Sequence, residues 1–191
     1  DGQLSMTFDG QEATIDYTVW SDVMICPHCG REFVFWDVAV FRNEKKMLEK
    51  FRCPGCGAEL TKKGSIVAKE TVFDSIQNKT VSIPKQIPVL IRYTTQDGKH
   101  WEKKPDEDDL KVIEKINSLK IPYWYPTDTV KKGDKTQEAI NKGITTVDFF
   151  FQKRNLYALS LIWANASNEM KFIITAFILR ATKMNKVHMH N

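Results

Sequence analysis

The chain has 191 residues, 28 of them Lys or Arg and 24 Asp or Glu, which gives a formal net charge of +4. Hydrophobic residues make up 42% and charged residues 27% of the sequence, which excludes collagen-like, low-complexity and wholly disordered chains. The longest apolar run is interrupted by Thr175 and is far shorter than the roughly 20 residues that a membrane-spanning helix needs. With no secretory signal pattern visible, we expect a folded cytoplasmic protein without a membrane partner.

The first hundred residues predict mainly β-structure. Apolar and polar residues alternate over 4–20 on both sides of a turn at Asp9-Gly10, which is typical of a β-hairpin. Further strand patterns follow over 66–104. Pro84 and Pro88 each remove a backbone donor, so the strand beside them should be an edge strand or carry a bulge.

The pattern becomes helical at Pro105, which is followed by four carboxylates of the kind that favour a helix N-terminus. Residues 127–143 are polar, with four lysines, and predict a long mobile loop. Thr145-Thr146 offers an N-cap for a short helix, 153–166 has an amphipathic helical pattern, and Ser167 can cap a last helix over about 169–185. We expect an α+β fold: a β-rich region over 1–104 with a metal ribbon at about 21–63, then a helical region over 105–191.

The last helical pattern is apolar almost all round. Such a helix must be covered on more than one side. A partner outside this chain could supply part of that cover.

All four cysteines stand in two Cys-Pro-x-Cys-Gly motifs, at 26–30 and 53–57. Proline sets φ for a sharp turn, and the glycine after the second cysteine permits a positive φ where amides point at the sulfurs. Four thiolates suit a closed structural Zn²⁺ site. We therefore expect zinc on Cys26, Cys29, Cys53 and Cys56. The residues between the motifs suit a hairpin, with a strand over 33–40, a turn over 42–46 and a return over 47–52.

Other interpretations of the cysteines stay open: two disulfides, free core thiols, or iron held by the same four ligands. His28 lies inside the first motif, but four cysteines already complete a metal shell, so we expect it to face solvent. His100 lies on a hairpin turn and has no evident nucleophile or carboxylate partner in the sequence.

The sequence contains none of the common catalytic motifs: no Gly-x-Gly-x-x-Gly, no Walker loop, no Gly-x-Ser-x-Gly and no His-Glu-x-x-His. We therefore do not expect this chain alone to be an enzyme.

Several stretches carry a family resemblance. TVWSDV at 18–23 runs into the first cysteine motif and is followed by VFW at 34–36. Further stretches are PVLI at 88–91, KKPD at 103–106, IPYWYPTD at 121–128, GITTVDFF at 143–150, RNL at 154–156 and RATKMN at 180–185. In this order they resemble the middle region of large site-specific DNA methyltransferases that modify adenine N6 or cytosine N4.

The resemblance implies that the chain is an insert of such a methyltransferase, of the restriction-modification kind. The family's catalytic Asp/Asn/Ser-Pro-Pro-aromatic motif is missing, the nearest match being Ile121-Pro122-Tyr123, and so is its Phe-x-Gly-x-Gly loop for S-adenosylmethionine. Methyl transfer and cofactor binding are then properties of the parent protein. We expect that this chain neither binds S-adenosylmethionine nor methylates DNA.

Such an insert is well placed to hold DNA or to brace the flanking methyltransferase domain, which are the two expected partners. The candidate phosphate contacts are basic residues of the second half: Lys131, Lys132, Lys135, Lys142, Lys153, Arg154, Arg180, Lys183 and Lys186. The same lysines could equally belong to an ordinary solvated loop.

Several polar and aromatic residues in the same half of the chain are expected to have structural roles. Asn155 and Asn185 lie near helix ends and are expected to be caps, while Tyr123, Trp124 and Trp163 are expected in the core. Two rival functions remain: a zinc-ribbon adaptor that binds protein or RNA, and a redox domain.

Overall fold

The computed structural model describes residues 5–8, 11–74, 79–141 and 143–184, and confirms an α+β chain with 32% helix and 34% strand. It divides into two compact units. One comprises the described residues of Asp1–Glu70 and Pro84–Glu107, the other those of Thr71–Ile83 and Asp108–His188. The described residues of 71–74 and 79–83 thus group with the helical region. Among the described residues, no helix combines the length and apolar character needed to cross a membrane.

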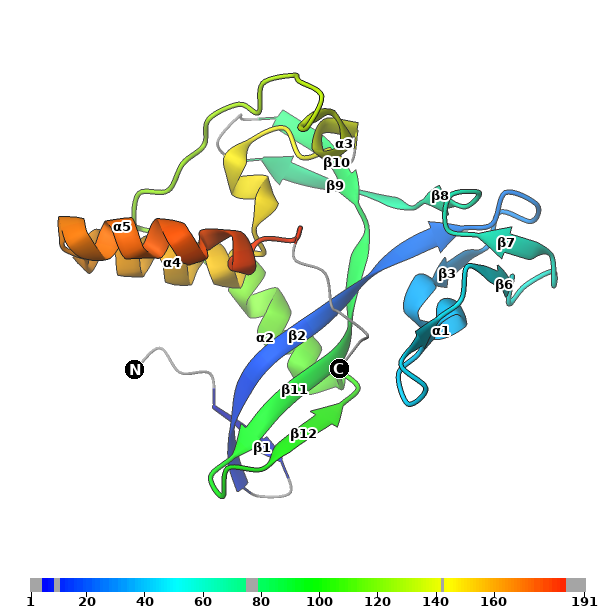
Figure 1. Ribbon diagram of the computed structural model, residues 1–191, viewed down its shortest axis with the longest axis horizontal. Helices are drawn as coiled ribbons and strands as arrows, with labels where there is room; N and C mark the ends of the chain where they lie inside the picture. The colour runs from blue at the N-terminus through cyan, green and yellow to red at the C-terminus, as the bar shows by residue number, and fades with distance from the viewer. Residues whose placement is uncertain (1–4, 9–10, 75–78, 142, 185–191) are drawn as a thin grey trace. The chain divides into compact units, whose positions relative to one another are not determined.

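Strand β2 (Gln11–Ile25) organises the first unit (Figure 1). Its first part lies in an antiparallel sheet of order β1-β2-β11-β12, with β1 at Ser5–Phe8, β11 at Gln86–Thr95 and β12 at His100–Lys103. Its last residues pair with β3 (Glu32–Val34) and β8 (Ile66–Val67). The predicted first hairpin is therefore confirmed, and its second strand continues to the first cysteine motif.

Pro88 acts as expected on β11. The register against β2 shifts between Pro88 and Leu90, which marks a bulge where a proline cannot donate to the ladder. Val89 and Leu90 are buried there together with Val19 of β2. The irregular strand still supplies a core face.

The residues around the cysteines form short elements: α1 (Phe35–Ala39), β4 (Val40–Phe41) with β5 (Lys46–Met47), and β6 (Lys50–Arg52) with β7 (Glu59–Thr61). The turn predicted at 42–46 lies between β4 and β5. The predicted strand over 33–40 is wrong, because α1 replaces most of it. Phe35 and Ala39 lie one helical turn apart on α1 and are both buried, 6% and 0% exposed, so one face of this short helix packs into the core.

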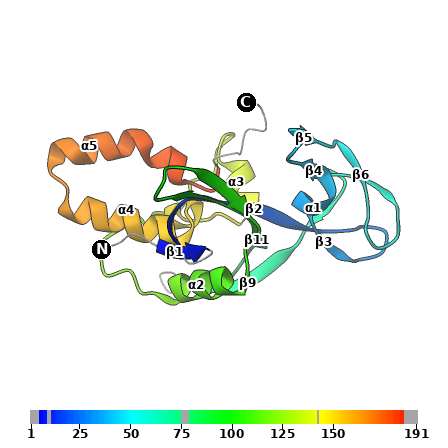
Figure 2. The same cartoon turned by 90° about the horizontal axis from the view of Figure 1, so that it is seen from below.

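The second unit contains the paired strands β9 (Lys69–Asp74, which begins in the first unit) and β10 (Lys79–Pro84), and most of the helices. These are α2 (Glu107–Ser118), α3 (Gln137–Asn141), α4 (Lys153–Asn165) and α5 (Asn168–Phe177), with 3-10 turns η1 (Val147–Phe150) and η2 (Ile178–Ala181). Helices α4 and α5 lie side by side as a helical hairpin (Figures 1 and 2). A core cluster of the second unit is built on Ile121, Phe151 and Leu156.

Three expectations for this unit need correction. The segment over 127–143 is not without structure, because it contains α3 and Thr129 forms a bridge to Thr146. Thr146 does precede η1, but its side chain makes no capping hydrogen bond. The last helix is shorter than predicted and changes to a 3-10 turn after Phe177. The cap by Ser167 is confirmed, since its hydroxyl accepts from the amide of Met170 at 3.3 Å.

Candidate metal centre

The four cysteine sulfurs converge on one point. Cys26 follows the end of β2, and Cys53 follows β6, so two strand ends deliver the two motifs. The four sulfurs all lie within 4.8 Å of one another. Cys26 and Cys53 are buried, whereas Cys29 and Cys56 are exposed. The cluster therefore has one side in the protein core and one side toward solvent.

The two motifs have the same backbone geometry. The amide of Gly30 donates to the carbonyl of Cys26 at 2.9 Å, and the amide of Gly57 donates to that of Cys53 at 3.0 Å. Gly30 has φ +71° and Gly57 φ +74°, a left-handed conformation that a side chain would strain. The positive φ predicted for these glycines is confirmed, although their own amides donate to carbonyls and not to the sulfurs.

The sulfurs are not joined by disulfides. Sγ of Cys26 lies 3.8 Å from Sγ of Cys56, and Sγ of Cys29 lies 3.7 Å from Sγ of Cys53, whereas a disulfide needs about 2.05 Å. All four cysteines are free. A close group of four free thiols, offered by two tight turns, could hold a metal ion such as zinc.

The protonation of the thiols is uneven. Backbone amides of Cys56 and Gly55 lower the pKa of Cys53 to about 6, and the Gly55 amide lies 3.3 Å from its sulfur. At Cys29 the amide of Arg31 acts to lower the pKa, but desolvation and the neighbouring thiols outweigh it and raise the pKa to about 11. The thiol of Cys53 thus ionises easily, whereas the thiol of Cys29 ionises with difficulty. A bound cation removes that difficulty, because metal coordination deprotonates thiols.

An aromatic core supports the cluster. Phe51 packs edge-on against Phe33 and Phe35, with ring centroids 5.9 Å and 5.6 Å apart. Lys62 lies 4.4 Å above the ring of Phe35. His28 is exposed and outside the ligand group, as expected.

The predicted DNA-contacting residues lie in separate segments of the second unit. Lys131, Lys132 and Lys135 are exposed and precede α3, Lys153 and Arg154 open α4, Arg180 is in η2, and Lys183 follows it. Lys142 and Lys186 lie outside the described residues, as does Asn185.

Two of these predictions can be judged from their surroundings. Arg154 is half-buried, and this burial lowers the pKa of its guanidinium, so it is more enclosed than the lysines before α3. Asn155 donates from Nδ2 to the carbonyl of Ala181 at 2.8 Å. That bond ties α4 to η2, a structural role.

The prediction of a core position for Trp124 is wrong, since this side chain is 65% exposed. Its ring lies 6.2 Å from that of Trp163, over which Lys171 is held at 5.6 Å. The signal was present in the sequence. In an extended segment alternate residues face opposite sides, so a buried Ile121 leaves Trp124 facing outward.

Sequence reasoning also missed the partners of His100. Its Nδ1 lies 2.8 Å from the hydroxyl of Thr94 and 3.5 Å from the carboxylate of Asp16. Thr94 pairs with His100 across the β11-β12 hairpin, a local signal. Asp16 belongs to β2, so its arrival depends on a pairing between distant parts of the chain.

Comparison with known proteins does not indicate a family for this chain. No protein-family model, no curated protein and no solved structure matches this chain.

Proposed function

We propose that the four cysteines hold one structural Zn²⁺ and that the chain is a non-catalytic insert of a DNA adenine-N6 or cytosine-N4 methyltransferase, helping to hold DNA or bracing the catalytic domain. The spacing of the sulfurs carries the zinc part. A tetrahedral site with zinc–sulfur bonds of about 2.3 Å has sulfurs about 3.8 Å apart. The two distances of 3.7 and 3.8 Å match that edge.

The role of the metal is to close the ribbon. When bound, zinc supplies charge neutralisation and a cross-link between the end of β2 and the β6-β7 turn, and it supplies no redox chemistry. Cys26, Cys29, Cys53 and Cys56 fill four positions and leave none open. A structural role follows from a complete ligand set.

Elemental analysis tests the metal. Protein purified without added metal should contain about one zinc per chain. A coloured, reducible iron centre would support a redox domain instead, and metal-free disulfide-linked protein would end the metal proposal.

The methyltransferase part rests on the sequence resemblance and on the placement of exposed cations. Lys131, Lys132 and Lys135 extend into solvent before α3, where they could contact phosphates without disturbing the core. Each phosphate contact releases condensed counterions, so binding that uses them weakens with salt at a log–log slope of about −0.9 per contact. S-adenosylmethionine and the chemistry belong to the parent protein.

Fluorescence anisotropy with a short labelled duplex at several salt concentrations tests this role. The triple variant K131Q/K132Q/K135Q should reduce the salt slope by roughly two to three units. A matched triple, K46Q/K63Q/K69Q, removes the same charge from exposed lysines elsewhere and should change the slope much less.

Two outcomes count against DNA holding. Equal effects of the two triples would mean that net charge alone attracts the duplex. No duplex binding at low salt would favour the adaptor, whose partner is protein or RNA.

A further inference from the structure

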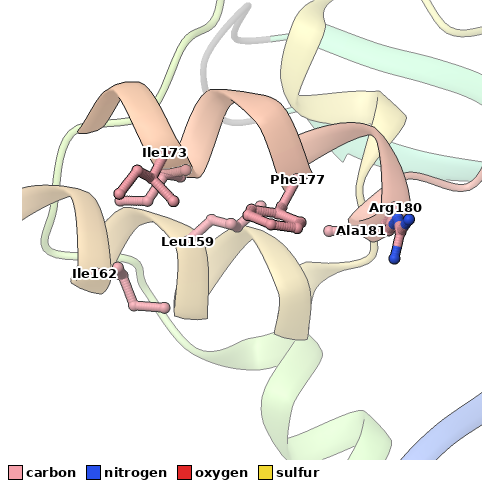
Figure 3. A pocket seen from close by; sticks show the side chains of 7 residues that line it. Leu159, Ile162, Ile173, Phe177, Arg180 and Ala181 are labelled. Carbon is pink, nitrogen blue, oxygen red and sulfur yellow. The ribbon is translucent and has the colours of Figure 1, made fainter. Parts of the chain in front are cut away.

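An apolar groove runs between α4 and α5 (Figure 3). It is lined by Leu159 and Ile162 of α4 and by Ile173 and Phe177 of α5. Leu159 points toward Phe177, and Arg180 lies at one end (Figure 3). The groove has a volume of about 390 Å³. All of the residues that line it belong to the second unit.

The residues around the groove are unusually open for their type. Phe177 is 58% exposed, Ile173 48% and Ile162 49%, and α5 contains no buried residue. A helix with this many apolar residues around its circumference is normally covered by other parts of a protein. An exposed apolar patch marks an interaction site.

Charge indicates what covers it. The stretch 153–184 carries five basic residues against one acidic residue, a net charge of +4. The basic residues are Lys153, Arg154, Lys171, Arg180 and Lys183, and the acidic one is Glu169. A second copy of the chain would bring the same positive charge, which opposes self-association. An acidic occupant is attracted instead.

The shape of the groove further limits the kind of partner that it can bind. A shallow apolar groove between two helices accepts a row of side chains from a third helix, whereas a helix that binds a membrane lays one continuous apolar face into the lipid. We propose that the α4-α5 groove binds an amphipathic helix with acidic flanks from another polypeptide segment, whose apolar residues at helical spacing enter the groove. This inference goes beyond the proposed function, because it needs neither the zinc nor DNA.

A synthetic peptide tests it directly. The probe is a fluorescein-labelled amphipathic peptide of about 20 residues, long enough to form helix in water, with leucines at i, i+3, i+4 and i+7 and glutamates on its flanks. The full chain should bind it measurably by anisotropy. A peptide with lysines in place of the glutamates should bind at least about tenfold more weakly, since like charges then meet.

Two phenylalanine variants locate the binding. Phe177→Ala, in the groove, should weaken binding of the acidic peptide about tenfold. Phe73→Ala removes an equally exposed ring, 65% against 58% exposed, from β9 outside the groove, and should leave binding unchanged. Both residues are exposed, so both variants should fold, which circular dichroism checks.

Each contrary result overturns the proposal. Equal affinity for both peptides, or equal loss in both variants, would remove the groove as a specific site. Concentration-dependent dimerisation in sedimentation velocity that Phe177→Ala abolishes would make a second copy the occupant. Binding to phosphatidylglycerol vesicles but to neither peptide would make it a lipid surface. None of these results bears on the zinc or on the lysines before α3.

Discussion

The cysteine ribbon and the α4-α5 hairpin use apolar residues in opposite ways. In the ribbon, Met24, Phe35 and Ala39 are at most 6% exposed although the elements around them are only two to five residues long, apart from the long β2. In the hairpin, α4 and α5 are longer, yet α5 buries none of its residues. Element length therefore does not decide which region completes its own core.

The two regions differ in the long-range contacts that bring their segments together. In the ribbon the two cysteine motifs draw distant strand ends together, and Phe33, Phe35 and Phe51 pack in the space that remains. Among the described residues, the hairpin contains no such cysteine cluster, and one of its faces stays open. The stability of the ribbon should thus depend on its own residues. The burial of the open face of the hairpin should depend on a binding partner.

Removing a ligand is the strongest way to break this comparison. Cys53→Ser should abolish metal binding and unfold the ribbon, because metal binding supplies about 10 kcal/mol or more in small zinc sites and is coupled to folding. Metal content per chain and amide signals of residues 24–60 report the loss. Signals of α4 should persist.

His28→Ala is the matched control, since it changes an exposed residue in the same motif and should keep the metal. A Cys53→Ser protein that retained one metal per chain and its ribbon signals would contradict the coupling.

A pair of phenylalanines sharpens the comparison. Phe35→Ala should lower the free energy of unfolding of the ribbon by about 3 kcal/mol, because it opens a cavity in a closed core. Phe172→Ala, at a side chain that is 79% exposed, should change stability by no more than about 0.5 kcal/mol. Native-state amide exchange in each region measures both. Equal costs would mean that the hairpin face is covered within the chain itself.

The predictable features were those that the chain encodes locally. The two cysteine motifs contain their own turn residues, so Gly30 and Gly57 could be assigned a positive φ from their positions alone. The cap at Ser167 was predictable for the same reason. The bulge at Pro88 follows from one missing donor.

The unpredicted features depend on distant contacts. The sequence Phe33-Val34-Phe35-Trp36 is rich in residues that favour strands, yet the core beside Phe51 selects a helix from Phe35 onward. Asp16 reaches His100 only because β2 pairs with β11. Neither the register of those strands nor the closure of the ribbon can be seen within a short window of sequence.

The smallest expected effect concerns the start of α5. Ser167→Ala removes the hydroxyl that accepts from the amide of Met170, and loss of such a cap costs about 1 kcal/mol of helix stability. Amide exchange in α5 should therefore quicken while the ribbon stays unchanged. The hydroxyl of Ser167 and the amide of Glu169 also hold the pKa of the Glu169 carboxyl below its ordinary value of 4.5. Because the folded pKa is the lower one, this stabilisation is present above pH 4.5 and is lost as the pH falls through the folded value. In the variant, the pKa of Glu169 followed by NMR should rise toward 4.5. An unchanged pKa together with unchanged exchange would show that α5 is held by its packing against α4 and not by its cap.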